Sequence, residues 1–291
     1  MSRPWNSEGQ ALTPYVRCGC QQGPPGGFLV GLIYSLWGFM RIRLAVPALA
    51  CAIVLGSLAA APAFADTAVK PTIDKAKVSS LVFGTTGTKK VSVSVTVSDD
   101  SGVEGVKTAP WPKLIDPPTE ADAADFTPAT CTASSATTSV CTYTEKLNVT
   151  DLANELAGTW YLAVQVTGKD GGTTFKPKAT SFSFKRQDKL AAANATPEPV
   201  KKNATLTVTS KLTRANWDNH KWQAYTKQSV KLQFLKSGTT AWKTVKTVKS
   251  STTGAVKATA KATAAGKWRF VYAGNSVSGA VTSAADTVKL K

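Results

Sequence analysis

Side chains suited to catalysis are sparse in this chain of 291 residues. The single histidine, His220, lies in the segment RANWDNHKW, a predicted loop between strands. A serine nucleophile would depend on this one residue, and the segment GNSVSG at residues 274–279 lacks the spacing of a G-x-S-x-G turn. Paired carboxylates for glycoside hydrolysis are scarce too, because residues 191–291 hold only Glu198, Asp218 and Asp286. We therefore predict that the protein is not an enzyme and has no catalytic residues.

The aromatic residues around His220 form a candidate ligand loop. Exposed aromatic rings beside polar groups can stack on the apolar face of a sugar while the polar groups bond its hydroxyls. The same rings can instead close the end of a hydrophobic core. The sequence leaves both interpretations open for the loop residues Trp217, Asp218, His220, Trp222 and Tyr225.

Acidic residues gather in two segments that have the composition of turns. Asp99 and Asp100 lie in SDDSGVEG with Glu104 nearby, and Asp170 lies in GKDGG. Carboxylate oxygens are calcium ligands, although Asp and Gly also favour turns for backbone reasons alone. No EF-hand loop is present. We predict no cofactor, and calcium stays an open alternative.

The elements that must position these residues are β-strands. Val91–Val97 (VSVSVTV) alternates apolar and polar residues with a period of two, which excludes a helix. Similar short runs recur through the chain, at residues 103–107, 139–143, 160–166, 181–184, 206–208, 230–234, 242–248, 256–261, 268–272 and 287–290. A helical turn or two is expected at residues 149–156. The pattern predicts an all-β protein with two tandem immunoglobulin-like β-sandwich domains after a signal peptide.

The composition suggests where these domains begin and end. A segment rich in Ala, Asn and Pro is expected to form a linker at residues 191–200. We predict the first sandwich domain at residues 66–190, with one disulfide, and a basic second sandwich domain at residues 201–291.

The formal net charge of +17 is concentrated in the second domain. Residues 1–65 carry +3, residues 66–190 carry no net charge, and residues 191–291 carry +14. Strand alternation places Lys231, Lys246, Lys257 and Lys261 on outward faces, so the charge should coat the sandwich rather than line a pocket. This favours diffuse attraction to an anionic cell-wall polymer or a glycan. No pattern for specific nucleic-acid binding accompanies it. The alternative is a soluble protein whose outward positions are filled with Lys.

The stretch that begins at Met40 has the features of a signal peptide. Arg41 and Arg43 precede an apolar run, and Ala63, Phe64 and Ala65 form a small-x-small cleavage pattern before Asp66. We predict a signal peptide at residues 40–65, cleavage between Ala65 and Asp66, and a true start at Met40. Residues 1–39 would then be a mis-assigned extension. If Met1 is the start, residues 28–60 could instead form a membrane-anchored hairpin or one long insertion signal.

No apolar anchor of about 20 residues follows residue 65, so we predict no membrane span in the mature chain. The predicted location is extracellular, either secreted or associated with the cell wall. Of the five cysteines, Cys18, Cys20 and Cys51 fall in segments absent from the mature protein. The remaining pair, Cys131 and Cys141, is predicted to form one disulfide, as suits an exported chain.

Several of these segments resemble actinobacterial secreted proteins. The runs PEPVKKNATLTVTSKLTRANWD (197–218), QSVKLQF (228–234) and WRFVYAG (268–274) are similar to a carboxy-terminal immunoglobulin-like domain in that group. The segment CTASSATTSVC (131–141) is similar to the amino-terminal half of the same group. The group is largely of unknown function and some members carry a calcium-binding label. The resemblance therefore implies that the protein is exported and has an immunoglobulin-like fold, and it implies little about an activity.

Overall fold

The computed structural model describes residues 68–291. Three predictions fall outside these residues: the extension at 1–39, the signal peptide at 40–65 and the cleavage between Ala65 and Asp66.

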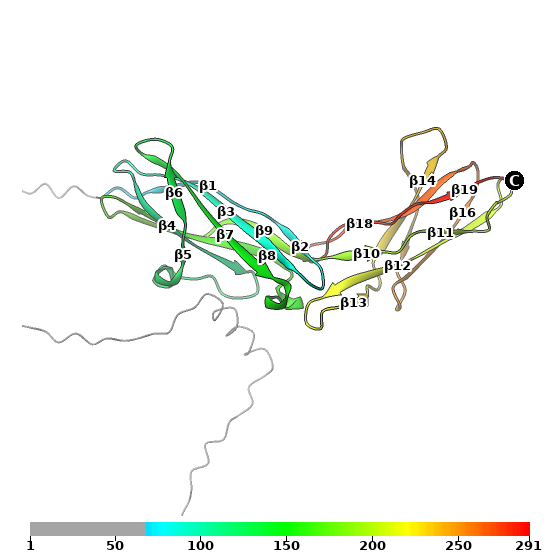
Figure 1. Ribbon diagram of the computed structural model, residues 1–291, viewed down its shortest axis with the longest axis horizontal. Coiled ribbons are helices and arrows are strands. Elements are labelled where there is room, and N and C mark those ends of the chain that lie inside the picture. The colour runs from blue at the N-terminus through cyan, green and yellow to red at the C-terminus, as the bar shows by residue number, and fades with distance from the viewer. Residues whose placement is uncertain (1–67) are drawn as a thin grey trace, which may run out of the picture. The chain divides into compact units, whose positions relative to one another are not determined.

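The first sandwich consists of two facing sheets (Figure 1). One sheet has the order β1 (Thr72–Val78), β3 (Thr88–Ser98), β7 (Thr138–Asn148), β6 (Thr130–Ala133). The other has the order β2 (Leu81–Phe83), β9 (Thr173–Arg186), β8 (Gly158–Gly168), β4 (Val103–Pro112), β5 (Thr127–Pro128). In immunoglobulin letters the first order is A-B-E-D, and β4, β8 and β9 are C, F and G. This strand order confirms the immunoglobulin-like prediction.

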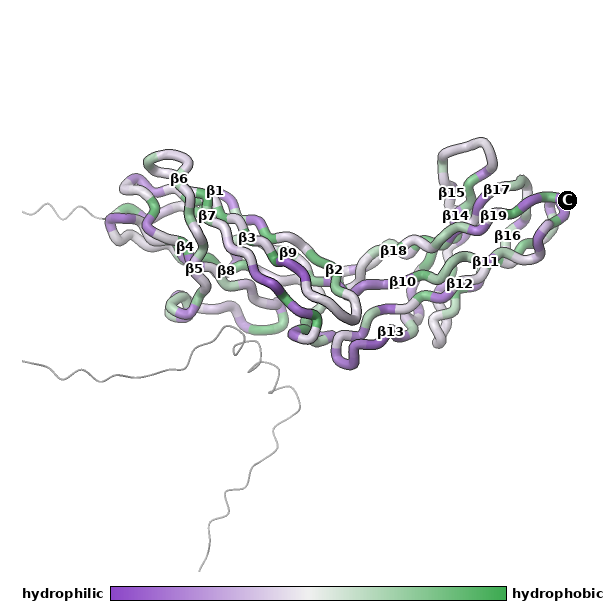
Figure 2. The backbone as a smooth tube through the Cα atoms, in the orientation of Figure 1, coloured by the Kyte–Doolittle hydropathy of each residue, from purple (hydrophilic) through white to green (hydrophobic). Residues whose placement is uncertain are grey.

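The alternation in the sequence sets which side chains enter the first core. Val91, Val93, Val95 and Val97 of β3 are all buried, whereas the residues between them are exposed or half-buried. The hydropathy of the chain alternates along the strands in the same way (Figure 2). Leu162, Val164 and Val166 of β8 and Phe182 and Phe184 of β9 meet them from the facing sheet.

Helical structure in the first sandwich is limited to short 3-10 turns. Two of them, Val149–Asp151 and Asn154–Leu156, fall in the segment predicted to turn helically, and a third spans Glu120–Asp125. Asn148 caps the first, accepting a hydrogen bond of 3.2 Å from the Thr150 backbone N–H. The first two turns form the connection between β7 and β8, and the third lies between β4 and β5.

The second sandwich also has two sheets. In one sheet, β12 (Thr205–Asn216) pairs with four strands: β11 (Asn194–Thr196) and β16 (Ala255–Lys261) along its first half, and β10 (Asp188–Leu190) and β13 (Lys221–Ala224) along its second. The other has the order β15 (Lys243–Lys249), β14 (Ser229–Lys236), β17 (Gly266–Tyr272), β18 (Val281–Thr282), with β19 (Asp286–Val288) also on β17. Trp268, Phe270 and Tyr272 are buried as the alternation predicts.

The segment between the sandwiches has more regular structure than its composition suggests. Within residues 191–200, Asn194–Thr196 forms β11 against β12, and Val200 forms a bridge to Leu290. Upstream of it, β10 already pairs with β12. These residues therefore contribute strands to the second sandwich, and the exact domain limits stay a prediction.

Among residues 68–291, the helices are too short and too polar to cross a bilayer.

Candidate functional site

The candidate ligand loop begins between β12 and β13 and continues through Trp222 on β13 to Tyr225 just after that strand. Its first aromatic ring faces inward. Trp217 is fully buried, and its Nε1 donates a hydrogen bond of 3.3 Å to the backbone carbonyl of Phe83. The two rings pack edge to face with centroids 6.1 Å apart. Phe83 belongs to β2 of the first sandwich, so this indole fills a core where the two sandwiches meet. It has no free face for a sugar, and the interpretation as core closure holds for Trp217.

The next residue of the loop, Asp218, is occupied by Asn154. Its Oδ1 accepts a hydrogen bond of 2.8 Å from the Asn154 backbone N–H, and its Oδ2 accepts from Asn154 Nδ2. Asn154 also bonds Asn216 Oδ1 (2.8 Å) and accepts from the Trp217 N–H (2.9 Å). One side chain of the β7–β8 connection thus holds the start of this loop, a role that no pattern in the sequence indicated.

The remaining residues of the loop do not converge on one site. His220 is exposed in a turn with a positive φ of 55°, within a hydrophilic stretch that runs into β13 (Figure 2). Trp222 is half-buried, and the Lys189 ammonium lies 3.9 Å from the centre of its ring. Tyr225 is buried under the Arg214 guanidinium, which stacks 3.9 Å from its ring centre. Two of the three rings are buried, and the third is covered by a cation. The interpretation that these rings stack on a sugar therefore has little support.

Buried charges lie where the chain passes from β9 of the first sandwich to β10 of the second, and the sequence analysis predicted none there. Burial raises the pKa of Asp188 to about 7, although the nearby Arg214, Ser278 and Arg186 act to lower it. Burial and the neighbouring charge of Arg214 lower the pKa of Arg186 to about 10. Arg186 Nε donates to the Ala215 carbonyl at 2.6 Å. These groups alternate in sequence with half-buried Lys185, exposed Gln187 and exposed Lys189, and only the tertiary contacts reveal that Arg186 and Asp188 are buried.

The basic surface of the second sandwich is made of lysines that face solvent. On the sheet of β12 and β16, Lys257 and Lys261 alternate with buried Val256 and Ala258, and Lys211 lies on the same outward face. Every lysine between residues 191 and 291 is exposed. The two arginines differ: Arg214 and Arg269 are half-buried and stack on Tyr225 and Trp242. Free cationic groups on this surface are therefore almost entirely ammonium groups.

The lysines of β15 need a second explanation. Lys246 is exposed as expected, but it pairs in register with Leu232, which is buried. It reaches solvent because β15 is the edge strand of its sheet. Lysines on an edge strand hinder pairing with the edge of another molecule. Part of the positive charge therefore has a structural use that is independent of any ligand.

Two turns of the first sandwich bring the acidic residues together. Asp99 and Asp100 follow β3, Asp170 lies between β8 and β9, and one carboxylate oxygen of each lies within 4.8 Å of the others. The turns are joined by a hydrogen bond of 2.9 Å from the Lys169 N–H to the Gly102 carbonyl. Glu104, which we considered with this group, is not part of the cluster.

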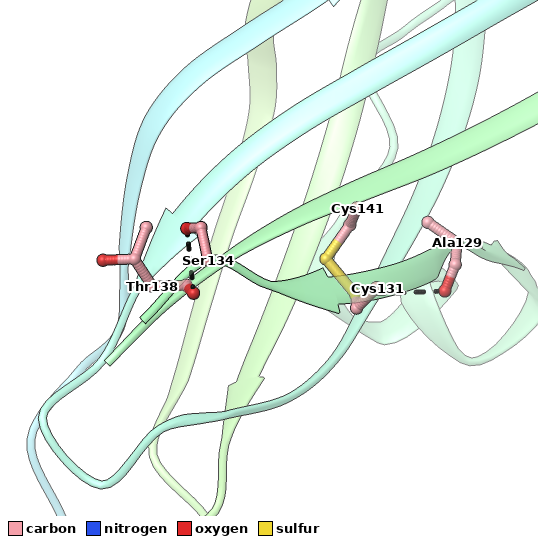
Figure 3. Close-up of a disulfide and its surroundings, with 5 residues drawn as sticks. All are labelled: Ala129, Cys131, Ser134, Thr138 and Cys141. Atoms are coloured by element: carbon pink, nitrogen blue, oxygen red, sulfur yellow. Dashed lines mark hydrogen bonds between the residues drawn. A yellow bond between two sulfur atoms is a disulfide. The ribbon is translucent and has the colours of Figure 1, made fainter. Parts of the chain in front are cut away.

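The disulfide between Cys131 and Cys141 is confirmed. It links directly opposite residues of the antiparallel strands β6 and β7 (Figure 3). The loop that it closes is stabilised by the Ser134 hydroxyl, which donates to the Thr138 carbonyl at 3.2 Å. The bond therefore supports the edge of the first sheet.

One family model matches part of the first sandwich. A family of unknown function (DUF5707) matches residues 79–166. No curated protein matches the chain. The matched residues include the segment 131–141, and the family is of unknown function. The similarity to actinobacterial secreted proteins stays a prediction, as does the resemblance of residues 197–274.

Solved structures of similar architecture are distant in sequence. The fibronectin(III)-like modules of Clostridium thermocellum CbhA are 15% identical over 76% of this chain and 92% of that chain, with a TM-score of 0.35. The Yersinia pseudotuberculosis adhesin InvE is 12% identical over 73% of this chain and 58% of that chain, with a TM-score of 0.24. Latent PorU from Porphyromonas gingivalis is 14% identical over 79% of this chain, with a TM-score of 0.27, and the chain spans 21% of its length.

Proposed function

We propose that this protein is an extracellular, non-enzymatic binding or surface-associated protein that attaches to an anionic cell-envelope polymer through its second sandwich. The observation that carries the proposal is the placement of the lysines. Residues 191–291 carry +14, and all of their lysines are exposed on strand faces, edges and turns. A surface of separate, strongly hydrated ammonium groups suits a flexible polyanion better than a ligand of fixed shape.

The extracellular location is supported by the disulfide and by the predicted signal peptide. Disulfides form and persist in oxidising compartments, and Cys131–Cys141 joins strands that are already paired. A sandwich of two antiparallel sheets is also a common scaffold for extracellular recognition, although the fold alone does not specify a ligand.

The test is retention of the purified protein on bacterial cell walls and on immobilised long-chain polyphosphate over a salt series. Neutralising a few phosphates releases counterions, so retention should fall by about tenfold or more between about 50 and 300 mM NaCl. Failure to bind at the lowest salt, or binding that is unaffected by salt, would overturn the proposal.

Two triple variants locate the attachment. Lys211, Lys257 and Lys261, all on one face of the second sandwich, are changed to Gln in the test variant. Lys75, Lys77 and Lys89, equally exposed on strands of the first sandwich, are changed to Gln in the control. Both variants lose the same charge. Only the first should elute at lower salt, and equal loss in both would contradict attachment through the second sandwich.

A further inference from the structure

We propose that Asp99, Asp100 and Asp170 bind a calcium ion at the end of the first sandwich where the β3–β4 and β8–β9 turns meet. This inference concerns residues that the electrostatic attachment does not use.

The backbone places the three carboxylates before any ion binds. Lys169 N–H donates to the Gly102 carbonyl at 2.9 Å, and the Asp170 N–H donates to Ser101 Oγ at 3.1 Å. These bonds join a turn that follows β3 to a turn that follows β8. The carboxylate oxygens consequently lie within 4.8 Å of one another, a spacing at which one cation can contact all three.

A buried oxygen without a partner is the independent sign of a ligand. Asp99 is only 5% exposed. Its Oδ1 accepts from the Ser101 N–H at 3.0 Å and from the Ser101 hydroxyl, whereas its Oδ2 is buried with no hydrogen-bond partner. A buried anionic oxygen without a partner is costly, and a bound cation removes that cost.

The fold makes specific room for this carboxylate. A Cβ atom on residue 168 would lie 2.6 Å from Asp99 Oδ2, so the glycine at this position lets the carboxylate lie against the β8 backbone. The two other acids are exposed and leave space for water. Asp170 also accepts from the Val69 N–H at 3.0 Å, which joins the site to the segment leading into the first sandwich.

The chemistry of the site selects calcium among common cations. All candidate ligands are oxygens, and water can complete the six to eight contacts that calcium takes. Magnesium demands a tighter octahedron and sheds its water reluctantly, and zinc prefers nitrogen and sulfur ligands. The Lys169 side chain is exposed and lies beside Gly102, in the turn that follows Asp99 and Asp100.

The experiment is calorimetric titration of the purified protein with calcium after removal of divalent ions, followed by thermal unfolding with calcium or with a chelator. We expect a Kd of about 10⁻⁴–10⁻³ M, in the range of extracellular modules, weaker binding of magnesium, and a higher Tm in calcium. No heat and no Tm shift at about 10 mM calcium would overturn the proposal, as would equal affinity for magnesium.

Variants separate this site from general charge effects. Asp100→Asn and Asp170→Asn keep the shape of two exposed side chains and should each weaken calcium binding at least about tenfold. Asp116→Asn removes an exposed acid outside the cluster and should bind as the wild type does. Lys169→Gln should bind calcium as tightly or more tightly. Unchanged affinity in both cluster variants, or a loss of binding in Lys169→Gln, would contradict the assignment.

Discussion

Asp188 is a carboxylic acid whose surroundings disfavour its charged form. It is 4% exposed, between Arg186 and Arg214, and burial outweighs both cations so that its pKa rises from 3.8 to about 7. The folded state therefore holds the proton more tightly than the unfolded chain. The contribution of protonated Asp188 to the stability of the folded state is complete below about pH 4 and is lost as the pH rises through about 7.

We predict that Asp188→Asn removes a pH dependence from this protein. In the wild type, the Asp188 contribution should lower the free energy of unfolding between pH 4 and about 7, and the Asn variant should flatten that slope. Urea unfolding at four pH values across this window measures the slope of the free energy of unfolding against pH. Asp116→Asn, an exposed acid, is the control and should keep the wild-type slope. An identical slope in Asp188→Asn would contradict the raised pKa.

At the scale of elements, the loop between β12 and β13 packs against the first sandwich. Its indole at Trp217 occupies a fully buried position against Phe83, while Trp222, five positions later, is half-buried on β13. The same residue type thus occupies two environments within one loop, which gives a matched pair of substitutions.

We predict that Trp217→Ala lowers the free energy of unfolding by about 3–5 kcal/mol, because it empties a buried volume and removes one of the hydrogen bonds to the Phe83 carbonyl. Trp222→Ala should cost about 1 kcal/mol or less, since it removes a half-buried ring and one cation–π contact. Denaturant unfolding of both variants measures this difference. Equal effects would show that the indole of Trp217 is not a core residue.

The hairpin of β6 and β7 gives a second prediction at this scale. Changing Cys131 and Cys141 together to Ser should lower the free energy of unfolding by about 2–3 kcal/mol, the chain-entropy value for a separation of 10 residues. Chemical unfolding of the variant, beside the wild type with and without reductant, measures it. A Ser134→Ala control removes only an exposed hydrogen bond. Stability unchanged by loss of the disulfide would contradict the prediction.

For the whole molecule, Asn154 is one of the polar links between the sandwiches, beside Arg186 of β9, whose Nε donates to the Ala215 carbonyl. Asn154 bonds Asp218, Asn216 and Trp217 through both its backbone N–H and its side chain. Removing the Asn154 side chain would take a hydrogen-bond partner from Asn216, which is buried. Such a loss is costly, because a buried polar group is left without that bond. Cooperative unfolding of the two sandwiches should therefore depend on Asn154.

We predict that Asn154→Ala splits thermal unfolding into two transitions where the wild type has one. Differential scanning calorimetry measures the number of transitions. Asn219→Ala, which changes an exposed residue of the same loop, is the control and should unfold as the wild type does. A single transition in Asn154→Ala at the wild-type Tm would show that other contacts suffice to couple the sandwiches.

The sequence by itself determined the strands and their inner faces. Val91–Val97 and Trp268–Tyr272 alternate with a period of two, and a strand with one buried face leaves little freedom in where such residues point. The cysteine pair was predictable for a similar reason, because only two cysteines remain after the expected export signal and they lie 10 positions apart.

Only the tertiary structure decided which loop residues are buried and which are brought together. The Trp217 indole bonds a carbonyl 134 positions earlier in the chain, and Asp170 bonds a hydroxyl 69 positions earlier. Loop residues carry no periodicity, so a buried aromatic and an exposed one look alike in the sequence. Which turns meet, and hence which carboxylates gather and which ring is covered, depends on the pairing of distant strands.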